Sequence, residues 1–375
     1  MKISVTQENL ATILNTVIKA TAVKPNIPVL ANILLKTEKN KLSFSATNLE
    51  ISITGWIGAD VAEEGELTVN ARLLTEFVSQ LQNNRIELIS SGQSLVVKSV
   101  DNQAQLYVIS ATDFPTLPAA IGEADIVVNA NEFKAAIDKT SFAAATDQSR
   151  PILTGLLLET TQRKLSLVGI DGFRLSKKII RLEKGPITDL KIIIPSKSLL
   201  DLAKIITDLA DDKDTVNIFL LKEKNQIIFK LKEITLSSRL LEGEFPDYKQ
   251  IIPTEKVVNI SINKAPFSNC VKIVNIFARN VLGNKTFFSI LADSKKLQLS
   301  TKVMDMGNNE TQAELNTITG ENYETAYNAK YLTEMLNSIS GDVVSFESNG
   351  TKAPGVFKDS ADENYLHVIM PMRME

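Results

Sequence analysis

The stretch "ILLKTEKNKLSFSATNLEISI" (residues 33–53) decides the fold, because the chain contains two similar stretches further along. These are "LLLETTQRKLSLVGIDGFRLS" (156–176) and "FSILADSKKLQLSTKVMDMGN" (288–308). Each has an apolar run, a short polar turn, a Lys-Leu pair and a second run in which apolar residues alternate. Alternation with a period of two on both sides of a polar turn predicts a β-hairpin.

The three hairpins recur at nearly constant spacing. Their Lys-Leu pairs begin at Lys41, Lys164 and Lys296, so the offsets are 164 − 41 = 123 and 296 − 164 = 132 residues. Internal repeats of this length indicate that one structural unit is used several times.

A strand followed by a helix also recurs three times. The stretches are "TVNARLLTEFVSQL" (68–81), "IIPSKSLLDLAKII" (193–206) and "AYNAKYLTEMLNSI" (326–339). In each, a short strand meets a polar or proline break, and apolar residues then follow at helical spacing. One more helix is predicted near the start of each copy. Its corresponding apolar residues are Leu10, Phe133 and Phe267.

These elements predict three tandem α+β domains, each with two helices on one face of an antiparallel sheet of roughly eight strands. We place the domains at residues 1–121, 122–253 and 254–375. Proline-punctuated links, "DFPTLP" (113–118) and "EFPDYKQIIP" (244–253), end the first two copies. The third copy ends instead in the apolar tail "VIMPMRME" (368–375).

The composition excludes several classes of protein. The 375 residues include one cysteine and one histidine, so a disulfide framework and a structural zinc site are not expected. The net charge of −3 gives no sign of a broadly basic nucleic-acid-binding surface. No apolar run is long enough to cross a bilayer. We therefore expect a cytoplasmic protein without a cofactor or metal.

The tail allows two interpretations. Pro371 cannot donate to a strand ladder, so regular pairing should stop near Met370, with Val368 and Ile369 in the last strand. The apolar side chains either close the hydrophobic core of the third domain or form a surface that a partner covers. Methionine is flexible and polarizable, which suits a surface that accepts varied partners.

A threefold repeat can close by itself, or form half of a six-domain ring with a second chain. If the sheets line up edge to edge around the outside of such a ring, the helices would line the inside. Cations on those helices include Lys19, Lys134, Lys139, Lys204, Lys272 and Lys330. Acidic residues lie among them, so ordinary solvated helix faces explain the charges equally well.

The triplication, "DGFRLS" (171–176), "GEFPDY" (243–248) and above all "VIMPMR" (368–373) resemble the bacterial sliding clamps, the β subunits of DNA polymerase III. The resemblance covers the whole chain. It implies a non-catalytic processivity factor, a head-to-tail homodimer that forms a six-domain ring around double-stranded DNA without reading its sequence. It also implies partners: the polymerase catalytic subunit, the clamp loader and other proteins with a clamp-binding motif.

The resemblance assigns residues to three sites. Those matching the cleft for partner peptides are Leu153, Ile170, Gly172, Phe173, Arg174, Leu175, Pro246, Gln250, Ile251, Asn328, Tyr331, Val368, Met370, Pro371, Met372 and Arg373. Those matching DNA-facing positions are Lys24, Arg72, Gln148, Arg150 and Lys197. The dimer seam would pair Ala104, Leu106 and Val108 of one chain with Val281 and Leu282 of the other.

The chain departs from the family pattern at two cleft positions. Phe173 stands where the family usually has histidine, and Gln250 where arginine is common. The first change makes the predicted cleft more apolar and removes a hydrogen-bond donor.

Two other classes stay open from the residues alone. One is an enzyme built from repeats, although no catalytic pair stands out. The other is a scaffold that binds proteins but not DNA. Cys270 lies in an apolar helical stretch and His367 on an alternating strand, so we interpret both as structural residues.

Overall fold

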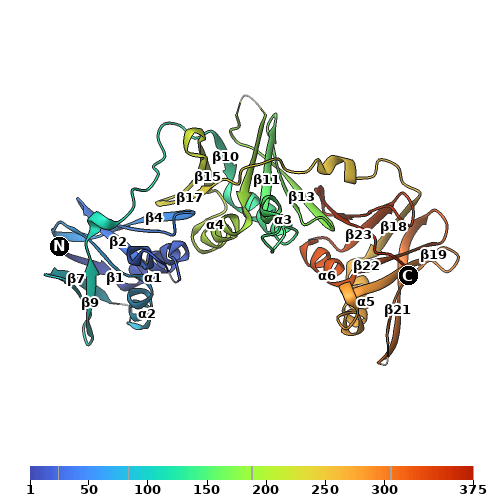
Figure 1. Cartoon of the computed structure of the whole chain (residues 1–375), viewed down its shortest axis with the longest axis horizontal. Coiled ribbons are helices and arrows are strands. Elements are labelled where there is room, and N and C mark those ends of the chain that lie inside the picture. Colours follow the sequence, from blue (N-terminus) through green and yellow to red (C-terminus); the bar gives the residue numbers. More distant parts are fainter. Residues whose placement is uncertain (24, 83, 187–188, 305, 375) are drawn as a thin grey trace. The chain divides into compact units, whose positions relative to one another are not determined.

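The protein is an α+β molecule of antiparallel sheets and paired helices, described here by a computed structural model (Figure 1). The structure describes residues 1–23, 25–82, 84–186, 189–304 and 306–374. Within them lie six α-helices: α1 (Gln7–Val17), α2 (Ala71–Gln80), α3 (Ala130–Ser141), α4 (Ser196–Leu209), α5 (Lys264–Ala278) and α6 (Ala329–Ser338).

The strands of the described residues fall into the three copies. The first copy has β1 (Lys2–Thr6), β2 (Asn32–Glu38), β3 (Lys41–Thr47), β4 (Ile51–Gly58), β5 (Asp60–Glu63), β6 (Glu66–Asn70), β7 (Arg85–Ser91), β8 (Ser94–Lys98) and β9 (Gln103–Ile109). The second has β10 (Ile126–Asn129), β11 (Gly155–Thr161), β12 (Lys164–Ile170), β13 (Arg174–Arg181), β14 (Leu190–Pro195), β15 (Thr215–Leu221), β16 (Gln226–Leu231) and β17 (Ile234–Arg239). The third has β18 (Val258–Asn263), β19 (Lys285–Leu291), β20 (Lys296–Val303), β21 (Gly307–Thr319), β22 (Tyr323–Asn328), β23 (Val343–Ser348), β24 (Gly355–Asp359) and β25 (Asp362–Ile369).

The predicted repeat is confirmed element by element. The hairpins are β2–β3, β11–β12 and β19–β20, and their second strands begin at Lys41, Lys164 and Lys296. The helices α2, α4 and α6 each begin directly after a strand. The side chains of Asn70 and Asn328 cap α2 and α6 by accepting hydrogen bonds from first-turn backbone amides.

Two long sheets cross the boundaries between copies. One sheet has the order β10-β15-β16-β17-β4-β3-β2-β6-β9-β8-β7-β1-β5, so β17 of the second copy pairs with β4 of the first. The other has the order β14-β11-β12-β13-β25-β24-β23-β18-β21-β20-β19-β22, so β13 pairs with β25 of the third copy. Each pairing covers strand edges that would otherwise be open to association with other chains.

Packing divides the chain into two compact units that follow these sheets. The first comprises residues 1–134, 182–186 and 201–240, and the second comprises 135–181, 187–200 and 241–375. The central copy is therefore shared between the units. The boundaries at 121/122 and 253/254 stay a prediction from the repeat.

In the first unit, α1 and α2 lie together, and α1 packs on β3 and β4 (Figure 1). Gly55 of β4 makes this packing possible. A Cβ atom there would lie 2.2 Å from Ile13 Cδ1 of α1 and 2.6 Å from Ile234 Cδ1 of β17. A side chain at this position would require the ends of the Ile13 and Ile234 side chains to shift.

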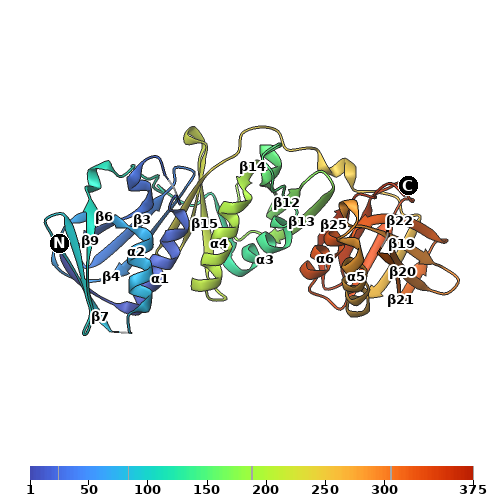
Figure 2. The same cartoon turned by 60° about the horizontal axis from the view of Figure 1, so that its bottom comes forward.

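In the second unit, α5 and α6 pack together, and α5 lies on β20 and β21 (Figure 2). Their core is aromatic. Phe288 lies 5.0 Å from Phe346 and 5.4 Å from Tyr327, measured between ring centroids. Tilted and edge-to-face contacts of this kind stabilise a core beyond simple burial of area.

Buried ion pairs support the junction of β13 and β25. Lys139 Nζ lies 2.9 Å from Asp362 Oδ2 and 3.4 Å from Asp359 Oδ2, and Lys178 Nζ lies 2.5 Å from Asp362 Oδ1. Burial opposes ionisation of Asp362, yet hydrogen bonds from Lys178 and Lys139 hold the pKa of that carboxyl below its usual range. Breaking a buried pair leaves an uncompensated charge, so this cluster favours one arrangement of the two strands.

The histidine of the chain, His367 on β25, is completely buried and stacks on Phe142 at 5.4 Å between centroids. Neither ring nitrogen has a hydrogen-bond partner within the described ranges. Burial, helped by the nearby charge of Arg174, lowers the pKa of His367 to about 3. The prediction of a structural role is consistent with this environment.

Unfolding should therefore become easier as the pH falls below about 6.5, the ordinary histidine pKa. The unfolded state takes up the proton first, so the stability is complete above that pH and is lost progressively toward a pH of about 3. We expect a loss of about 2 kcal/mol between pH 6.5 and pH 5. Urea unfolding at several pH values measures it. A His367→Leu variant should lose this slope, and a slope that persists would contradict the assignment.

Candidate functional site

The turn between β12 and β13 is built by the sequence "DGFR" (171–174). Gly172 has a φ of 92°, a conformation that glycine adopts without steric cost. Asp171 Oδ1 accepts hydrogen bonds from the backbone amides of Phe173 at 2.8 Å and Arg174 at 2.9 Å. The turn is thus fixed locally, and it presents Phe173, whose side chain is 64% exposed.

Arg174 holds this turn against the third copy. Its guanidinium donates to Asp171 Oδ2 at 3.0 Å, to the carboxylate of Glu334 on α6, and to the carbonyl of Phe142. It also lies 4.3 Å from the centre of the Tyr331 ring. Because Arg174 is only 7% exposed and fully engaged, it supports the site and offers little to a ligand.

The tail leaves the sheet as predicted. The strand β25 ends at Ile369, and Met370 N then donates to the carbonyl of Phe173 at 2.8 Å. After Pro371, Met372 N donates to the carbonyl of Ala326 on β22 at 2.7 Å. The backbone is therefore tied to the second copy on one side and to β22 on the other.

A hollow of about 700 Å³ opens beside this tail. Of the predicted cleft residues, it is lined by Phe173, Asn328, Tyr331, Met370, Pro371, Met372 and Arg373. The remaining lining residues are Val281, Leu282, Gly283 and Lys285. The family resemblance places Val281 and Leu282 in the predicted dimer seam, and Leu282 is 96% exposed. Nothing in the local sequence pattern indicated that these two residues also border the hollow.

Four other predicted cleft residues are core residues. Leu153, Ile170, Leu175 and Val368 are each at most 5% exposed and belong to one buried cluster with Tyr248. Ile251 is partly buried against the same cluster. Gln250 is exposed and donates from Nε2 to Asp247 Oδ2 at 2.9 Å.

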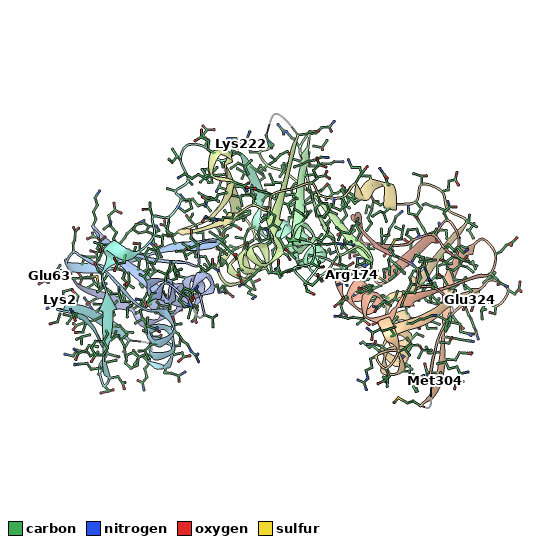
Figure 3. All side chains as sticks on the ribbon, viewed as in Figure 1. Lys2, Glu63, Arg174, Lys222, Met304 and Glu324 are labelled. Carbon is green, nitrogen blue, oxygen red and sulfur yellow. The ribbon has the colours of Figure 1, made fainter. Side chains whose placement is uncertain are left out.

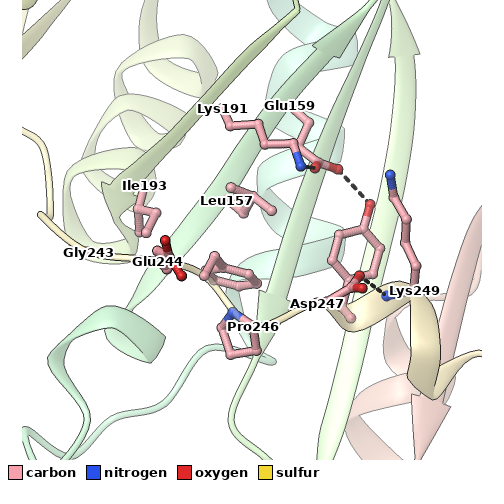
Figure 4. A pocket seen from close by; sticks show the side chains of 11 residues that line it. Leu157, Glu159, Lys191, Ile193, Gly243, Glu244, Pro246, Asp247 and Lys249 are labelled. Carbon is pink, nitrogen blue, oxygen red and sulfur yellow. Dashed lines mark hydrogen bonds and ion pairs between the residues drawn. The ribbon is translucent and has the colours of Figure 1, made fainter.

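Pro246 lines a different hollow, of about 380 Å³, beneath the link after the second copy (Figure 4). Leu157 and Ile193 contribute apolar surface to it. Tyr248 Oη donates to Glu159 Oε2 at 2.6 Å, and burial together with this carboxylate raises the pKa of Tyr248. Sequence reasoning missed this buried hydrogen bond, which fastens the link and its residues Pro246, Gln250 and Ile251 to β11.

The predicted DNA-facing residues are solvent-accessible where the structure describes them. Lys24 lies outside the described residues. Arg72 of α2 has an 83% exposed side chain and is paired with Glu76 at 2.7 Å. Gln148, Arg150 and Lys197 are exposed in the second unit. Their positions relative to Arg72 remain a prediction.

The predicted seam strand β9 has an unpaired edge. It pairs with β8 along its length but with β6 only through Val108 and Ile109, so residues 103–107 show no partner on that side within the described chain. Ala104 and Val108 are half-buried, while Leu106 is 5% exposed and faces the core. Tyr107, which belongs to the predicted seam stretch "AQLYV" (104–108), is 88% exposed.

No group of three or more His, Cys, Asp or Glu side chains within the described ranges is arranged to hold a metal ion. Cys270 is buried in α5, as predicted. Among the described helices, none has the length and apolar character needed to span a membrane.

Comparison with known proteins identifies the family. Models of the N-terminal, central and C-terminal domains of the DNA polymerase III beta subunit match residues 1–118, 127–247 and 249–373. Beta sliding clamps from Synechococcus elongatus and Staphylococcus aureus are 28% and 26% identical, with 100% of this chain and at least 99% of each relative covered.

Solved structures agree over the full length of both chains. The sliding clamp of Bacillus subtilis has a TM-score of 0.94 at 25% identity. A sliding clamp of Pseudomonas aeruginosa bound to griselimycin has a TM-score of 0.93 at 26% identity. The chain therefore belongs to the family of DNA polymerase III beta subunits, the non-catalytic beta sliding clamps that act as processivity factors.

Proposed function

We propose that two copies of this chain join head to tail around double-stranded DNA in the cytoplasm and tether DNA enzymes through the hollow beside the tail. Those enzymes would be the polymerase catalytic subunit, the clamp loader and other proteins that carry a short clamp-binding segment. The observation that carries the proposal is the tail itself. Its backbone is anchored on both sides, while its methionine side chains line an open apolar hollow.

The chemistry of the hollow favours an apolar peptide segment. Phe173 and Tyr331 supply aromatic surface, and Met370 and Met372 can adjust to different side chains. Covering one large apolar side chain contributes about 1.5–3 kcal/mol. A few such contacts support micromolar affinity after the costs of association are subtracted. Phe173 replaces the histidine usual in the family, so we expect greater tolerance of purely apolar segments.

Retention on DNA would come from enclosure. Contacts of Lys and Arg with phosphates are sensitive to salt and carry no sequence information. A sliding ring needs these contacts weak and dispersed, and the net charge of −3 is compatible with that need. A protein scaffold that does not bind DNA is the remaining alternative. Retention on circular DNA, with loss after linearisation, would distinguish the ring from the scaffold.

Deleting Met370–Glu375 should abolish stimulation of the polymerase while leaving the dimer intact, because one wall of the hollow is removed. Primer-extension length measures stimulation, and light scattering measures the dimer. Ile121→Asp provides a control, since Ile121 is 86% exposed in the link between the first two copies and lies outside the hollow. Undiminished stimulation by the deleted chain would refute the cleft assignment.

Introducing a charge at Tyr107 tests the seam. Tyr107→Asp should reduce the mass measured by light scattering from two chains to one at micromolar concentration, because an exposed apolar side chain at each seam is lost. Val257→Asp is the matched control, since Val257 is also exposed but lies directly before β18 in the third copy, outside the predicted seam. A Tyr107→Asp protein that remains dimeric would show that the seam lies elsewhere.

Charge reversal of Lys24, Arg72 and Lys197 together should shorten the time for which loaded protein stays on circular DNA. Each lost phosphate contact weakens binding, and the loss should grow smaller as salt is raised. Reversal of Lys222, Lys224 and Lys230 supplies the control, since these exposed lysines lie in the short 3-10 turn η5 (Lys222–Lys224) and on β16, outside the α-helices. Equal lifetimes for the two triple variants would mean that the DNA-facing residues are misassigned.

A further inference from the structure

Three exposed cations gather where β12 begins and β13 ends. Arg163, Lys164 and Arg181 line a hollow of about 560 Å³, together with Gln162, Ile179, Ile180 and Asn364. None of the three cations has an ion-pair partner within the part of the chain that the structure describes. We call this surface the β13-end patch, and it belongs to none of the sites described above.

The arrangement of these cations is unfavourable in the unbound protein. Lys164 and Arg181 are directly opposite each other in the β12–β13 ladder. Like charges in that position repel and weaken strand pairing. Elsewhere in the same unit, neighbouring cations are paired with an acid. Lys256 Nζ and Lys358 Nζ lie 2.6 and 2.8 Å from the two carboxylate oxygens of Glu347. An anion bound between Lys164 and Arg181 would relieve the repulsion.

The patch lies on the face of the sheet opposite α3. Ser176 of β13 donates from Oγ to the carbonyl of Lys139 on α3, so alternate residues from Lys177 to Arg181 point to the other face. Lys177 confirms this direction, because its Nζ lies 5.2 Å from the centre of the Tyr248 ring. Ile179 and Arg181 therefore face the same side as the link after the second copy.

One strand connects this patch to the tail hollow. β13 begins at Arg174, beside Phe173 of the hollow, and ends at Arg181. Seven residues of extended strand span about 23 Å. A peptide seated in the hollow would need at least about seven further residues in an extended conformation to reach the patch, and it would have to pass the link residue Tyr248, which packs over Lys177.

We propose that the β13-end patch binds an acidic peptide segment, which flanks the apolar segment that a tethered partner inserts into the tail hollow. The proposal rests on the proposed function for the role of the hollow. Acidic side chains would pair with Arg163, Lys164 and Arg181, and an apolar side chain between them would contact Ile179. The patch adds affinity by linking two weak contacts in one ligand.

Nucleic acid fits the patch less well. Surfaces that hold single strands combine cations with exposed aromatic side chains on which bases stack. The aromatic residues beside β13, Tyr248 of the link and Tyr365 of β25, are only 2% and 1% exposed. Duplex DNA would face the helices in the proposed ring, whereas the patch lies on the face opposite α3. The half-buried apolar side chain at the patch is Ile179, which can contact a leucine-like side chain of a peptide.

The test uses a fluorescein-labelled peptide, Glu-Leu-Glu-Asp-Leu-Glu, whose binding to the full chain is followed by anisotropy at low salt. We expect Arg163→Glu with Arg181→Glu to weaken binding about tenfold, because surface ion pairs are replaced by repulsion. Reversal of Lys222, which Figure 3 labels, and of Lys224 inverts two exposed charges in the first unit and should change binding less than twofold. The neutral peptide Gln-Leu-Gln-Asn-Leu-Gln should bind at least tenfold more weakly.

Folding of the variant is checked separately. Arg181→Glu places an acid opposite Lys164, so the urea midpoint should stay equal or rise. Equal weakening by both double reversals, or equal binding of the neutral peptide, would overturn the proposal. Displacement of the acidic peptide by a lower concentration of oligo-dT would assign the patch to single-stranded nucleic acid instead. The chain lacking Met370–Glu375 should still bind the acidic peptide. A wrong assignment of the patch and a wrong assignment of the cleft therefore give different experimental results.

Discussion

Strand pairing across the copy boundary is the constraint on which the candidate site depends. β13 and β25 pair in one antiparallel register that sets Arg174 opposite Ile369 and Leu175 opposite Val368. This register brings the turn of the second copy to the point where the tail leaves the sheet. A slip by one residue would turn every side chain of one strand to the opposite face. The hollow is therefore a consequence of how two copies of one module share a sheet.

The site combines a fixed base with an adaptable rim. Arg174 is held by two carboxylates, a carbonyl and an aromatic ring, and the nearby Lys178–Asp362 pair adds a buried charge contact between β13 and β25. The rim consists of Phe173 and the tail methionines, which have few such restraints. Such a division lets the binding surface adjust without disturbing the strand pairing beneath it.

Much of the fold follows from local pattern in the sequence. The Lys-Leu pairs mark the first residue of β3, β12 and β20, and the last strand, β25, ends at Ile369, two residues before Pro371. Patterns in a single sequence do not show which strand edges meet across copies. For that reason the central copy's division between two units, the burial of Leu175 and Val368, and the exposure of Tyr107 emerged only from the structure. The Glu159–Tyr248 hydrogen bond joins residues 89 positions apart, and no sequence pattern near either residue indicates it.

The buried histidine has a further consequence for the surface of the molecule. Histidine is the side chain that ordinarily changes its charge between pH 5 and pH 8. In this chain the single histidine is enclosed and uncharged throughout that interval while the protein is folded. Acidification from pH 8 to pH 5 would thus leave the contribution of histidine to the electrostatic potential around the protein unaltered. A change in association with another molecule over that interval would not come from a histidine of this chain.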